Sequence, residues 1–461
     1  MASSDFLGAL EDAFDASAVS MAEADLRIHA VDQGPLEHWE TQLPLAVVFA
    51  ESVEDVQKLV RLAGEHGVAV VTRAAGTSVS GGANAVTGSV VLNLTRMNRI
   101  LQVRPEDEVA VVEPGVINAE LNAAVAEHGL MYAPDPASYR TSTIGGNVAT
   151  NAGGLRCAKY GVTRDSVLAL DVVLADGTLI RTGSATFKGV AGYDLTSLFV
   201  GSEGTLGIIV GITVRLRYLS PKVETIAAFF DDLPTAAQGV LEIGRARVQP
   251  AIMELLDRGT MQALDGAHGS DLAQRGAALL LLQTDGYGAQ IEAEMIREVL
   301  VKLGGRVSAP GDEESNRLVN LRRHARGDGI VNEARVGEDV AVPRSQLVKY
   351  VEALEGLAAE HRVDLKVVAH AGDGNLHPTF SVSSDDGVIP AEAMERLQAA
   401  LDGSVRVALD MGGTITGEHG IGTYKLRWLG WEQNDDVIAL QRQIKQAFDP
   451  NNLLNPNRAI L

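Results

Sequence analysis

The chain has 461 residues, is 46% hydrophobic and carries a formal net charge of −21. This length and apolar content predict two or three domains with real cores, and the acidic balance disfavours nucleic acid and acidic lipid as partners. No uncharged apolar run reaches the roughly 18–20 residues that span a bilayer, and the first residues are acidic where a targeting peptide is basic. We therefore expect a soluble, cytoplasmic protein, and its single cysteine, Cys157, excludes an intrachain disulfide.

The first half of the chain alternates short buried-type strands with amphipathic helices. Ser52 and Asp55 have the spacing of a capping box, one face of the following segment is apolar, and Gly67 is a typical helix stop. A second helix is predicted over 118–129. Strands are predicted over 68–73, 89–94 and 108–115, with two more in 167–183 joined by an Asp-Gly turn.

After Pro221 the pattern changes to longer helices that alternate with apolar strands. Helices are predicted over 231–247, 293–305 and 344–362, and strands over 278–286 and 365–372. This is a second α/β layer unit. A last helix and a Pro-terminated coil are predicted within 437–456.

Three glycine-rich segments, 73–83, 133–154 and 201–212, share small residues and hydroxyls in the first half of the chain. Such loops expose backbone N–H groups and let a backbone approach a flat or phosphorylated ligand. The first is neither a G-x-G-x-x-G nor a P-loop motif, and by itself it is also typical of a tight turn. The second is harder to explain as a plain loop, because such a long stretch of small polar residues in a compact domain is usually functional. Three of them in one domain favour a large dinucleotide.

These motifs carry a resemblance to a known family. "RAAGTSVSGG", "STIGGNVATNAGG", "YGVTRDSVLALDVVLADG", "VGSEGTLGIIVGITVRL", "HAGDGNLH", "GEHGIG" and "FDPNNLLNP" resemble the vanillyl-alcohol oxidase/p-cresol methylhydroxylase flavoproteins over residues 40–461. The similar branch contains D-lactate dehydrogenase, the flavin subunit of glycolate oxidase and D-2-hydroxyglutarate dehydrogenase.

The resemblance implies an α+β fold with four parts. They are a helical lead-in (1–39), a two-part FAD-binding domain of the p-cresol methylhydroxylase type (40–218), an α/β substrate or cap domain with an antiparallel sheet (219–412), and a C-terminal segment that returns to the FAD domain (413–461).

The same resemblance implies FAD as cofactor, with the pyrophosphate on Gly76–Gly82. Covalent members often carry a histidine in the first glycine loop, and 73–83 has none, so we expect non-covalent FAD. The implied cofactor-binding residues are Arg73, Gly76, Thr77, Ser78, Gly81, Gly82, Pro134, Asp135, Ser138, Thr143, Gly145, Gly146, Asn147, Thr150, Asn151, Gly153, Gly154, Glu203, Gly204, Gly207, Ile208, Ile209 and Asn455.

Two histidines, His370 and His377, flank a Gly-Asp-Gly-Asn turn sequence. Seven positions apart, they are about 10 Å apart on a helix and face opposite sides of a straight strand, so only a chain reversal brings them together. Two histidines make a poor metal site by themselves, and a turn or capping role is the alternative. A His₂Glu site resembles the family's metal centre, which assigns His370, His377 and Glu418 as ligands and leaves His419 as the candidate general base.

The implied reaction is the oxidation of a small 2-hydroxy acid anion to its 2-oxo acid. A divalent ion, with zinc as the first candidate and manganese or iron suited to the same ligands, would lower the pKa of the substrate hydroxyl. His419 would accept the proton, and hydride would pass to flavin N5. The resemblance favours Arg322 for the carboxylate, with Arg326 at the helically adjacent i+4 position. The alternative for this cluster is a solvated helix face, which we favour for Arg323. Asn375 and Thr379 complete the implied substrate site.

The substrate prediction depends on two departures from hydroxyglutarate-type members. Those members carry a lysine near 336–343, where this chain has Glu338 and Asp339, and an asparagine at the position of Thr379. A second carboxylate would meet acidic residues there, so we favour the D-lactate or glycolate class.

Three alternatives stay open at this stage. They are a D-2-hydroxyglutarate dehydrogenase with a different distal pocket, a flavin subunit of a larger glycolate oxidase-like complex, and a non-flavin metal hydrolase. The electron acceptor is expected to be a soluble carrier or a partner redox protein, and the oligomeric state, a homodimer included, stays open.

Overall fold

A computed structural model describes residues 2–34, 42–323, 333–384 and 388–460. The chain forms two compact units. The first comprises Met1–Gly153, Gly161–Leu219 and Glu418–Leu461, and the second comprises Gly154–Tyr160 and Ser220–Gly417. Among the described residues, no helix combines the length and the apolar character needed to cross a bilayer.

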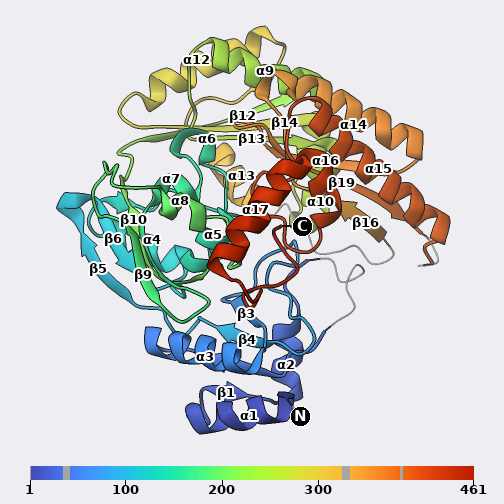
Figure 1. Ribbon diagram of the computed structural model, residues 1–461. Helices are drawn as coiled ribbons and strands as arrows, with labels where there is room; N and C mark the ends of the chain where they lie inside the picture. The colour runs from blue at the N-terminus through green and yellow to red at the C-terminus, as the bar shows by residue number, and fades with distance from the viewer. Residues whose placement is uncertain (1, 35–41, 324–332, 385–387, 461) are drawn as a thin grey trace. The chain divides into compact units, whose positions relative to one another are not determined.

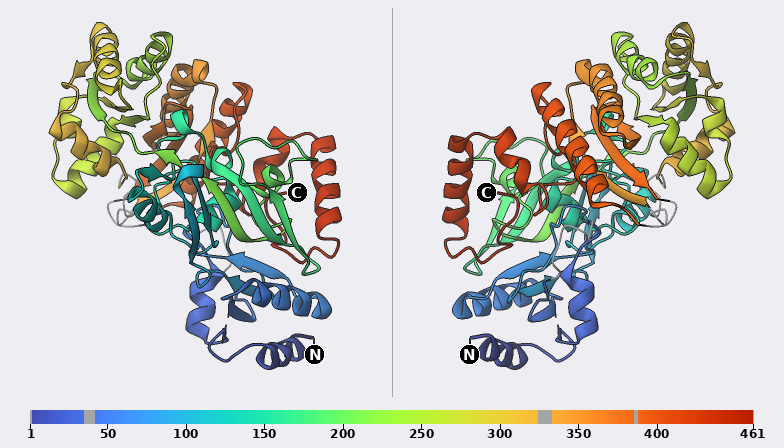
Figure 2. Two further views of the ribbon diagram at one scale, coloured as in Figure 1. Left: turned by 90° about the vertical axis from the view of Figure 1, so that its left-hand side faces the viewer. Right: turned by 90° about the vertical axis from the view of Figure 1, so that its right-hand side faces the viewer.

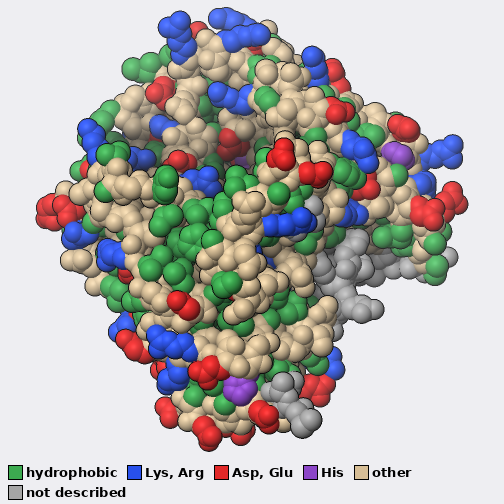
Figure 3. All heavy atoms as spheres, in the orientation of Figure 1, with side chains coloured by type: hydrophobic (Ala, Val, Ile, Leu, Met, Phe, Trp, Pro, Cys, Tyr) green, Lys and Arg blue, Asp and Glu red, His purple; other side chains and the backbone are tan. Residues whose placement is uncertain are grey.

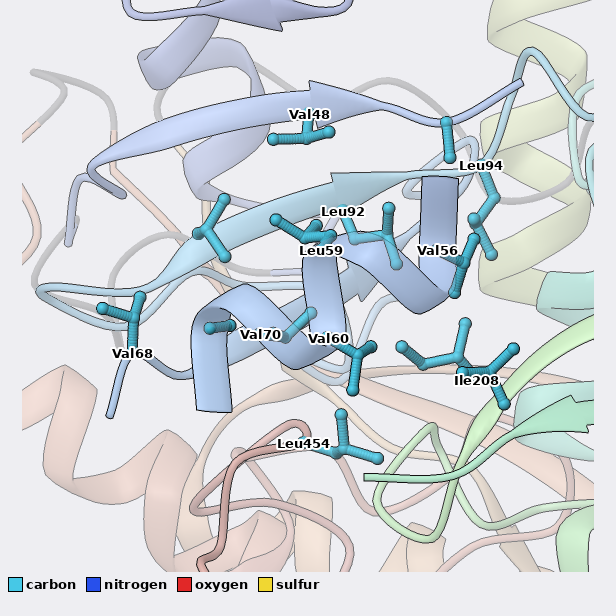
Figure 4. Close-up of a cluster of buried hydrophobic side chains, with 14 of the residues drawn as sticks. Val48, Val56, Leu59, Val60, Val68, Val70, Leu92, Leu94, Ile208 and Leu454 are labelled. Carbon is cyan, nitrogen blue, oxygen red and sulfur yellow. The ribbon is translucent and has the colours of Figure 1, made fainter. Parts of the chain in front are cut away.

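The first unit begins with a four-stranded sheet in the order β1 (Val19–Ser20), β2 (Ala46–Phe49), β4 (Val90–Asn93), β3 (Val70–Arg73). Strands β2, β4 and β3 are parallel. The helices of this part of the unit are α1 (Ala2–Ala13), α2 (Glu23–Ala30) and α3 (Val53–His66). Helix α3 has the predicted capping box between Ser52 and Asp55 and ends at left-handed Gly67. Figure 4 shows the reason for its position: Val56, Leu59 and Val60 enter one core with side chains of the sheet.

A second, antiparallel sheet has the order β5 (Ile100–Arg104), β6 (Val109–Val112), β10 (Ile208–Arg215), β8 (Val167–Val173), β9 (Leu179–Gly183). Its other elements are α4 (Asn118–Ala126), α5 (Ile144–Thr150), α7 (Thr163–Ser166), α8 (Leu195–Phe199) and the pair β7 (Leu130–Met131) and β11 (Arg217–Tyr218). Strand β10 is buried almost throughout, because it lies in the middle of this sheet.

The C-terminal segment returns to this unit after α16 (Leu426–Glu432) and α17 (Asp435–Phe448). Leu454 is fully buried in the first core and forms a parallel bridge with Val70. The buried ammonium of Lys445 donates to the carbonyls of Thr205 and Leu454. Burying a cation demands such partners, so Lys445 fixes the segment to the loop before β10.

The second unit is built on one antiparallel sheet in the order β15 (Arg306–Val307), β12 (Val223–Phe230), β14 (Ala278–Asp285), β13 (Ile252–Asp257), β18 (Asp364–His370), β19 (Asn375–Ser383), β16 (Glu333–Gly337), with β17 (Val340–Ala341) also on β19. Its helices are α6 (Cys157–Tyr160), α9 (Leu233–Arg245), α10 (Arg258–His268), α11 (Leu272–Arg275), α12 (Ala289–Lys302), α13 (Glu313–Arg323), α14 (Leu347–His361) and α15 (Ala391–Asp410).

The helices of this unit cover the two faces of its sheet unequally. The long helices α9, α12, α14 and α15 pack against one another and against the sheet as one layer (Figure 1 and Figure 2). Residues of α10, α11 and α13 share a core with the side chains of Ile252, Leu256 and Leu281. Side chains of β13 with even residue numbers therefore face α10 and α13.

The predicted α+β class, the antiparallel sheet of the second unit and the return of the C-terminal segment are confirmed. The helices predicted from 3.6-residue periodicity and the strands predicted from apolar runs are present. On the face that Figure 3 displays, basic side chains are interspersed with acidic ones, so the acidic excess is not gathered into one patch there.

Candidate active site

The two histidines lie on a hairpin. Strand β18 ends at His370 and β19 begins at Asn375, with Gly374 at a φ of 81° where a Cβ would be 2.2 Å from the Val342 carbonyl oxygen. Val368 is paired with His377 across β18 and β19. His370 is two residues further along β18, so it is the diagonal neighbour of His377 on the same face of the sheet. The ring centroids are 5.3 Å apart. The predicted chain reversal is confirmed.

A buried glutamate extends this row of side chains across the sheet. Glu254 of β13 is directly opposite His370 in the register and has no exposed surface. Its Oε1 lies 2.7 Å from His370 Nδ1, and its Oε2 lies 2.6 Å from Nη2 of Arg322, which comes from α13. One carboxylate thus contacts a predicted metal ligand and the predicted carboxylate-binding arginine.

A second buried acid, Asp339, organises the other side of the histidines. Its carboxylate lies 3.9 Å from His377 Nδ1 and accepts hydrogen bonds from Asn375 Nδ2, Thr416 Oγ1 and the Gly417 amide. Asp339 therefore holds the end of the segment that precedes Glu418. Asp339, one of the two acidic residues that we expected near a distal substrate carboxylate, lies beside His377.

Glu418 and His419 begin the last segment of the first unit, and this loop is fixed by that unit's own residues. Ser80 Oγ donates to the carbonyl of His419, and the Ser80 carbonyl accepts from the amides of Thr423 and Tyr424. Glu203 accepts from the amides of Ile421 and Gly422. The backbone that carries His419 is thus bonded to the first and third glycine-rich segments.

Burial shifts the pKa values of two charged groups that contact this loop, Glu203 and Arg458, in opposite directions. It raises the pKa of Glu203, although the Ile421 and Gly422 amides and the charges of Arg458 and Lys425 oppose the shift. It lowers the pKa of Arg458 to about 10, while Glu203 and Asp32 oppose that shift. Arg458 donates to the carbonyls of Gly82 and Asn84, so the C-terminal segment braces the first glycine loop.

The glycine-rich segments have the compact turns that a dinucleotide site requires. Gly76 and Gly81 have positive φ values of 66° and 77°, and Ser78 Oγ accepts from the amides of Ser80 and Gly82. Arg73 donates to the Val31 carbonyl, and Asn455 joins the Thr72 amide to the Glu203 carbonyl.

The second segment is packed as closely as the first. Thr143 caps α5 through the Gly146 amide, and a Cβ on Gly145 would be 2.5 Å from Pro114 Cβ. Buried Ser142 Oγ and Ser202 Oγ have no hydrogen-bond partner among the described residues. Hydroxyls of this kind suit FAD, so the second and third segments fit this cofactor.

The donor set of the second unit also fits a divalent ion. Imidazole nitrogens and carboxylate oxygens are the ligands that zinc, manganese and iron share. Glu418 directly follows Gly417, and the Gly417 amide donates a hydrogen bond to Asp339.

The remaining predicted residues are placed as follows. Thr379 is half-buried on β19, Asn375 uses its amide hydrogens on Asp339 and the Val340 carbonyl, and the side chain of Ile208 lies in the first core. Arg326 lies outside the described residues. Apart from Asn455 in the C-terminal segment, the other implied cofactor residues lie on the three glycine-rich segments, with Gly154 counted in the second unit.

Sequence reasoning missed the roles of Glu254 and Asp339. The signal for Glu254 was a charged residue inside the apolar strand "IMELLD", because a charge inside a core needs a partner. Asp339 was named from the sequence as an acidic residue near the substrate, but no local signal indicated its contact with His377.

Comparisons with known proteins place the chain in a family. A family model described as "FAD binding domain" matches residues 44–183, and one described as "FAD linked oxidases, C-terminal domain" matches 219–459. The glycolate oxidase subunit GlcD of Bacillus subtilis (strain 168) is 39% identical over 421 residues, 90% of this chain and 89% of that protein. The D-lactate dehydrogenase of Archaeoglobus fulgidus is 34% identical, over 90% of this chain and 91% of its own.

The fold has solved counterparts. The crystal structure of p-cresol methylhydroxylase with substrate bound has a TM-score of 0.76 at 20% identity, covering 99% of this chain and 96% of that chain. An alkyldihydroxyacetonephosphate synthase structure has a TM-score of 0.74 at 18% identity, covering 98% and 84%. The chain therefore belongs to the FAD-linked oxidases with a p-cresol methylhydroxylase-type fold, and is an FAD-linked oxidoreductase.

Proposed function

We propose that this chain is an FAD- and divalent-metal-dependent dehydrogenase that oxidises a small D-2-hydroxy acid, of the D-lactate or glycolate class, to the 2-oxo acid. The observation that carries the proposal is the pairing of His370 and His377 on one sheet face, with Glu254 and Asp339 buried behind them. Relatives named glycolate oxidase subunit and D-lactate dehydrogenase support the substrate class.

In this proposal His370, His377 and Glu418 hold the ion. Such an ion supplies a Lewis acid that lowers the pKa of a substrate hydroxyl. Bound FAD supplies the acceptor for the electrons of the oxidised carbon. We assign the cofactor to the three glycine-rich segments and Asn455.

We assign proton transfer to His419, because a neutral imidazole accepts a proton near pH 7. We assign the substrate carboxylate to Arg322, whose side chain is only 4% exposed. Its Nε has no hydrogen-bond partner among the described residues, so a donor is left over after the pair with Glu254. A guanidinium with an unused donor suits a carboxylate.

Steady-state rates on D-lactate, glycolate and D-2-hydroxyglutarate test the substrate class. Because Thr379 offers no amide and residues 336–343 contain no lysine, we expect kcat/KM to be highest for a monocarboxylate. Preference for the five-carbon diacid would overturn this assignment.

A second proposal is that the chain works as the flavin subunit of a larger redox complex. Relatives from Bacillus subtilis and Escherichia coli are named as subunits. In addition, Val190 and Tyr193, between β9 and α8, are 99% and 95% exposed, which is unusual for large apolar side chains near one another in a loop. If the purified chain reduces a dye acceptor at full rate without a partner, this proposal fails.

A further inference from the structure

We propose that Glu254 is a positioning residue that orients both His370 and Arg322, and so couples the metal side of the site to the side that binds the substrate carboxylate. This inference rests on the proposed function and adds a residue that the reaction itself does not call for.

The position of Glu254 follows from strand register. On β13 its side chain points to the same face as Ile252 and Leu256, toward α10 and α13. Since Glu254 is paired with His370 across β13 and β18, the two side chains are direct cross-strand neighbours. His377 lies one diagonal step further, so three strands present an acid and two imidazoles in one row.

The contact with His370 selects which ring nitrogen can serve an ion. Glu254 Oε1 lies 2.7 Å from Nδ1, so this nitrogen carries the hydrogen when the carboxylate accepts. Nε2 is then the nitrogen that we assign to the ion. A carboxylate behind a histidine ligand fixes the ring orientation and increases its basicity, and its loss typically costs about 10–100-fold in metal affinity.

The contact with Arg322 uses the other oxygen of the same carboxylate. The ion pair between Nη2 and Oε2 is 2.6 Å long, and the side chains of the two residues are 4% and 0% exposed. A guanidinium held at one edge has a fixed plane, so its remaining donors keep one direction. Glu254 therefore places the charge that receives a substrate carboxylate relative to the imidazole that receives the ion.

Asp257, three residues along the same strand, provides the contrast. It is also buried, but it caps α10 by accepting from the Thr260 amide. The hydrogen bond and ion pair of Glu254 go to His370 and Arg322 and satisfy no helix end. A purely structural acid and a positioning acid thus stand on one strand, which makes Asp257→Asn a matched control.

The test is a metal titration without turnover. The full-length, FAD-loaded chain is stripped with chelator and titrated with Zn²⁺ against a chromophoric competitor, in the absence of substrate. We expect Glu254→Gln to weaken Zn²⁺ binding about 10–100-fold, and Asp257→Asn to change it less than about twofold. At saturating Zn²⁺, Glu254→Gln should also raise KM for D-lactate about tenfold, with a smaller change in kcat, because Arg322 loses its fixed orientation.

Each outcome decides a different claim. Equal Zn²⁺ affinity for wild type and Glu254→Gln overturns the role of Glu254 while the proposed function stands. A wild-type chain that binds neither Zn²⁺ nor Mn²⁺ overturns the metal-dependent function and this inference with it. If Glu254→Gln loses its flavin absorbance through misfolding, Glu254→Asp decides instead: it keeps the charge but is too short for both contacts, and unchanged Zn²⁺ affinity in it contradicts the inference.

Discussion

At the scale of single residues, the site joins side chains that are close in sequence to others that are far away. The meeting of His370 and His377 could be predicted, because Gly372-Asp373-Gly374-Asn375 is typical of a reversal and Gly374 has the positive φ that it requires. The contact between Glu254 and His370 spans 116 residues. This contact depends on the pairing of β13 with β18, and no local sequence pattern determines which strands pair.

His419→Ala tests the proposed base. We expect flavin reduction by D-lactate to slow about 10²–10⁴-fold, the usual contribution of a general base, with the flavin spectrum unchanged. Anaerobic stopped-flow absorbance measures the rate. His128→Ala, which removes an exposed histidine after α4, is the control and should leave the rate as it is. Equal rates for the two variants would place the base elsewhere.

His377→Ala tests the proposed ligand set. The variant should retain FAD but lose at least about tenfold in Zn²⁺ affinity, because two ligands hold an ion less well than three. Metal content after gel filtration and competitive titration both report this. Replacement of exposed His268 should have no effect. A variant with wild-type metal content would refute the assignment of His377.

At the scale of elements, periodicity predicted several helices and strands of the cores, but it missed the buried strands β12 and β13. Helix α3 and strand β3 follow from an apolar face and a buried run. Strand β19 was not predicted, because Pro378 interrupts its pattern. The structure accommodates Pro378 opposite Val367, so tertiary pairing decides this element.

Asn455→Ala tests whether the C-terminal segment supports the cofactor loops. Asn455 has a φ of 43°, donates to the Glu203 carbonyl and accepts from the Thr72 amide. Losing these buried bonds costs about 1–3 kcal/mol, so we expect FAD affinity to fall roughly tenfold or more. Fluorescence of released flavin measures it. Asn452→Ala shares the left-handed backbone but lacks these contacts, and a similar loss in it would show that backbone strain alone is responsible.

Asp194 gives a prediction with a defined pH dependence. It caps α8, and the hydrogen bonds from the Ser197 hydroxyl and amide lower its pKa. A lowered carboxyl pKa contributes stability above the unfolded value of about 3.9, and this stability is lost as the pH falls through the folded pKa. Asp194→Ala should therefore increase amide exchange in α8 about fivefold at pH 7, and the difference should close only below about pH 4. A difference that closes already between pH 7 and pH 5 would contradict the lowered pKa.

At the scale of the whole molecule, the chain builds its first unit from three separated segments and its second from two. Motif resemblance predicted the return of the C-terminal segment, whereas local pattern could not, because Leu454 meets Val70 across most of the chain. The buried charges explain what keeps the return in place: Lys445, Glu203 and Arg458 each find partners on a segment distant in sequence.

The central claim is that a flavin and a metal ion act together on a small D-2-hydroxy acid. The most direct measurement is anaerobic bleaching of the bound flavin by D-lactate, glycolate, L-lactate and D-2-hydroxyglutarate, each with and without chelator. We predict bleaching by D-lactate or glycolate that chelator abolishes and that added Zn²⁺ or Mn²⁺ restores. Bleaching that chelator does not affect, or an absence of bleaching with every acid, would contradict the claim.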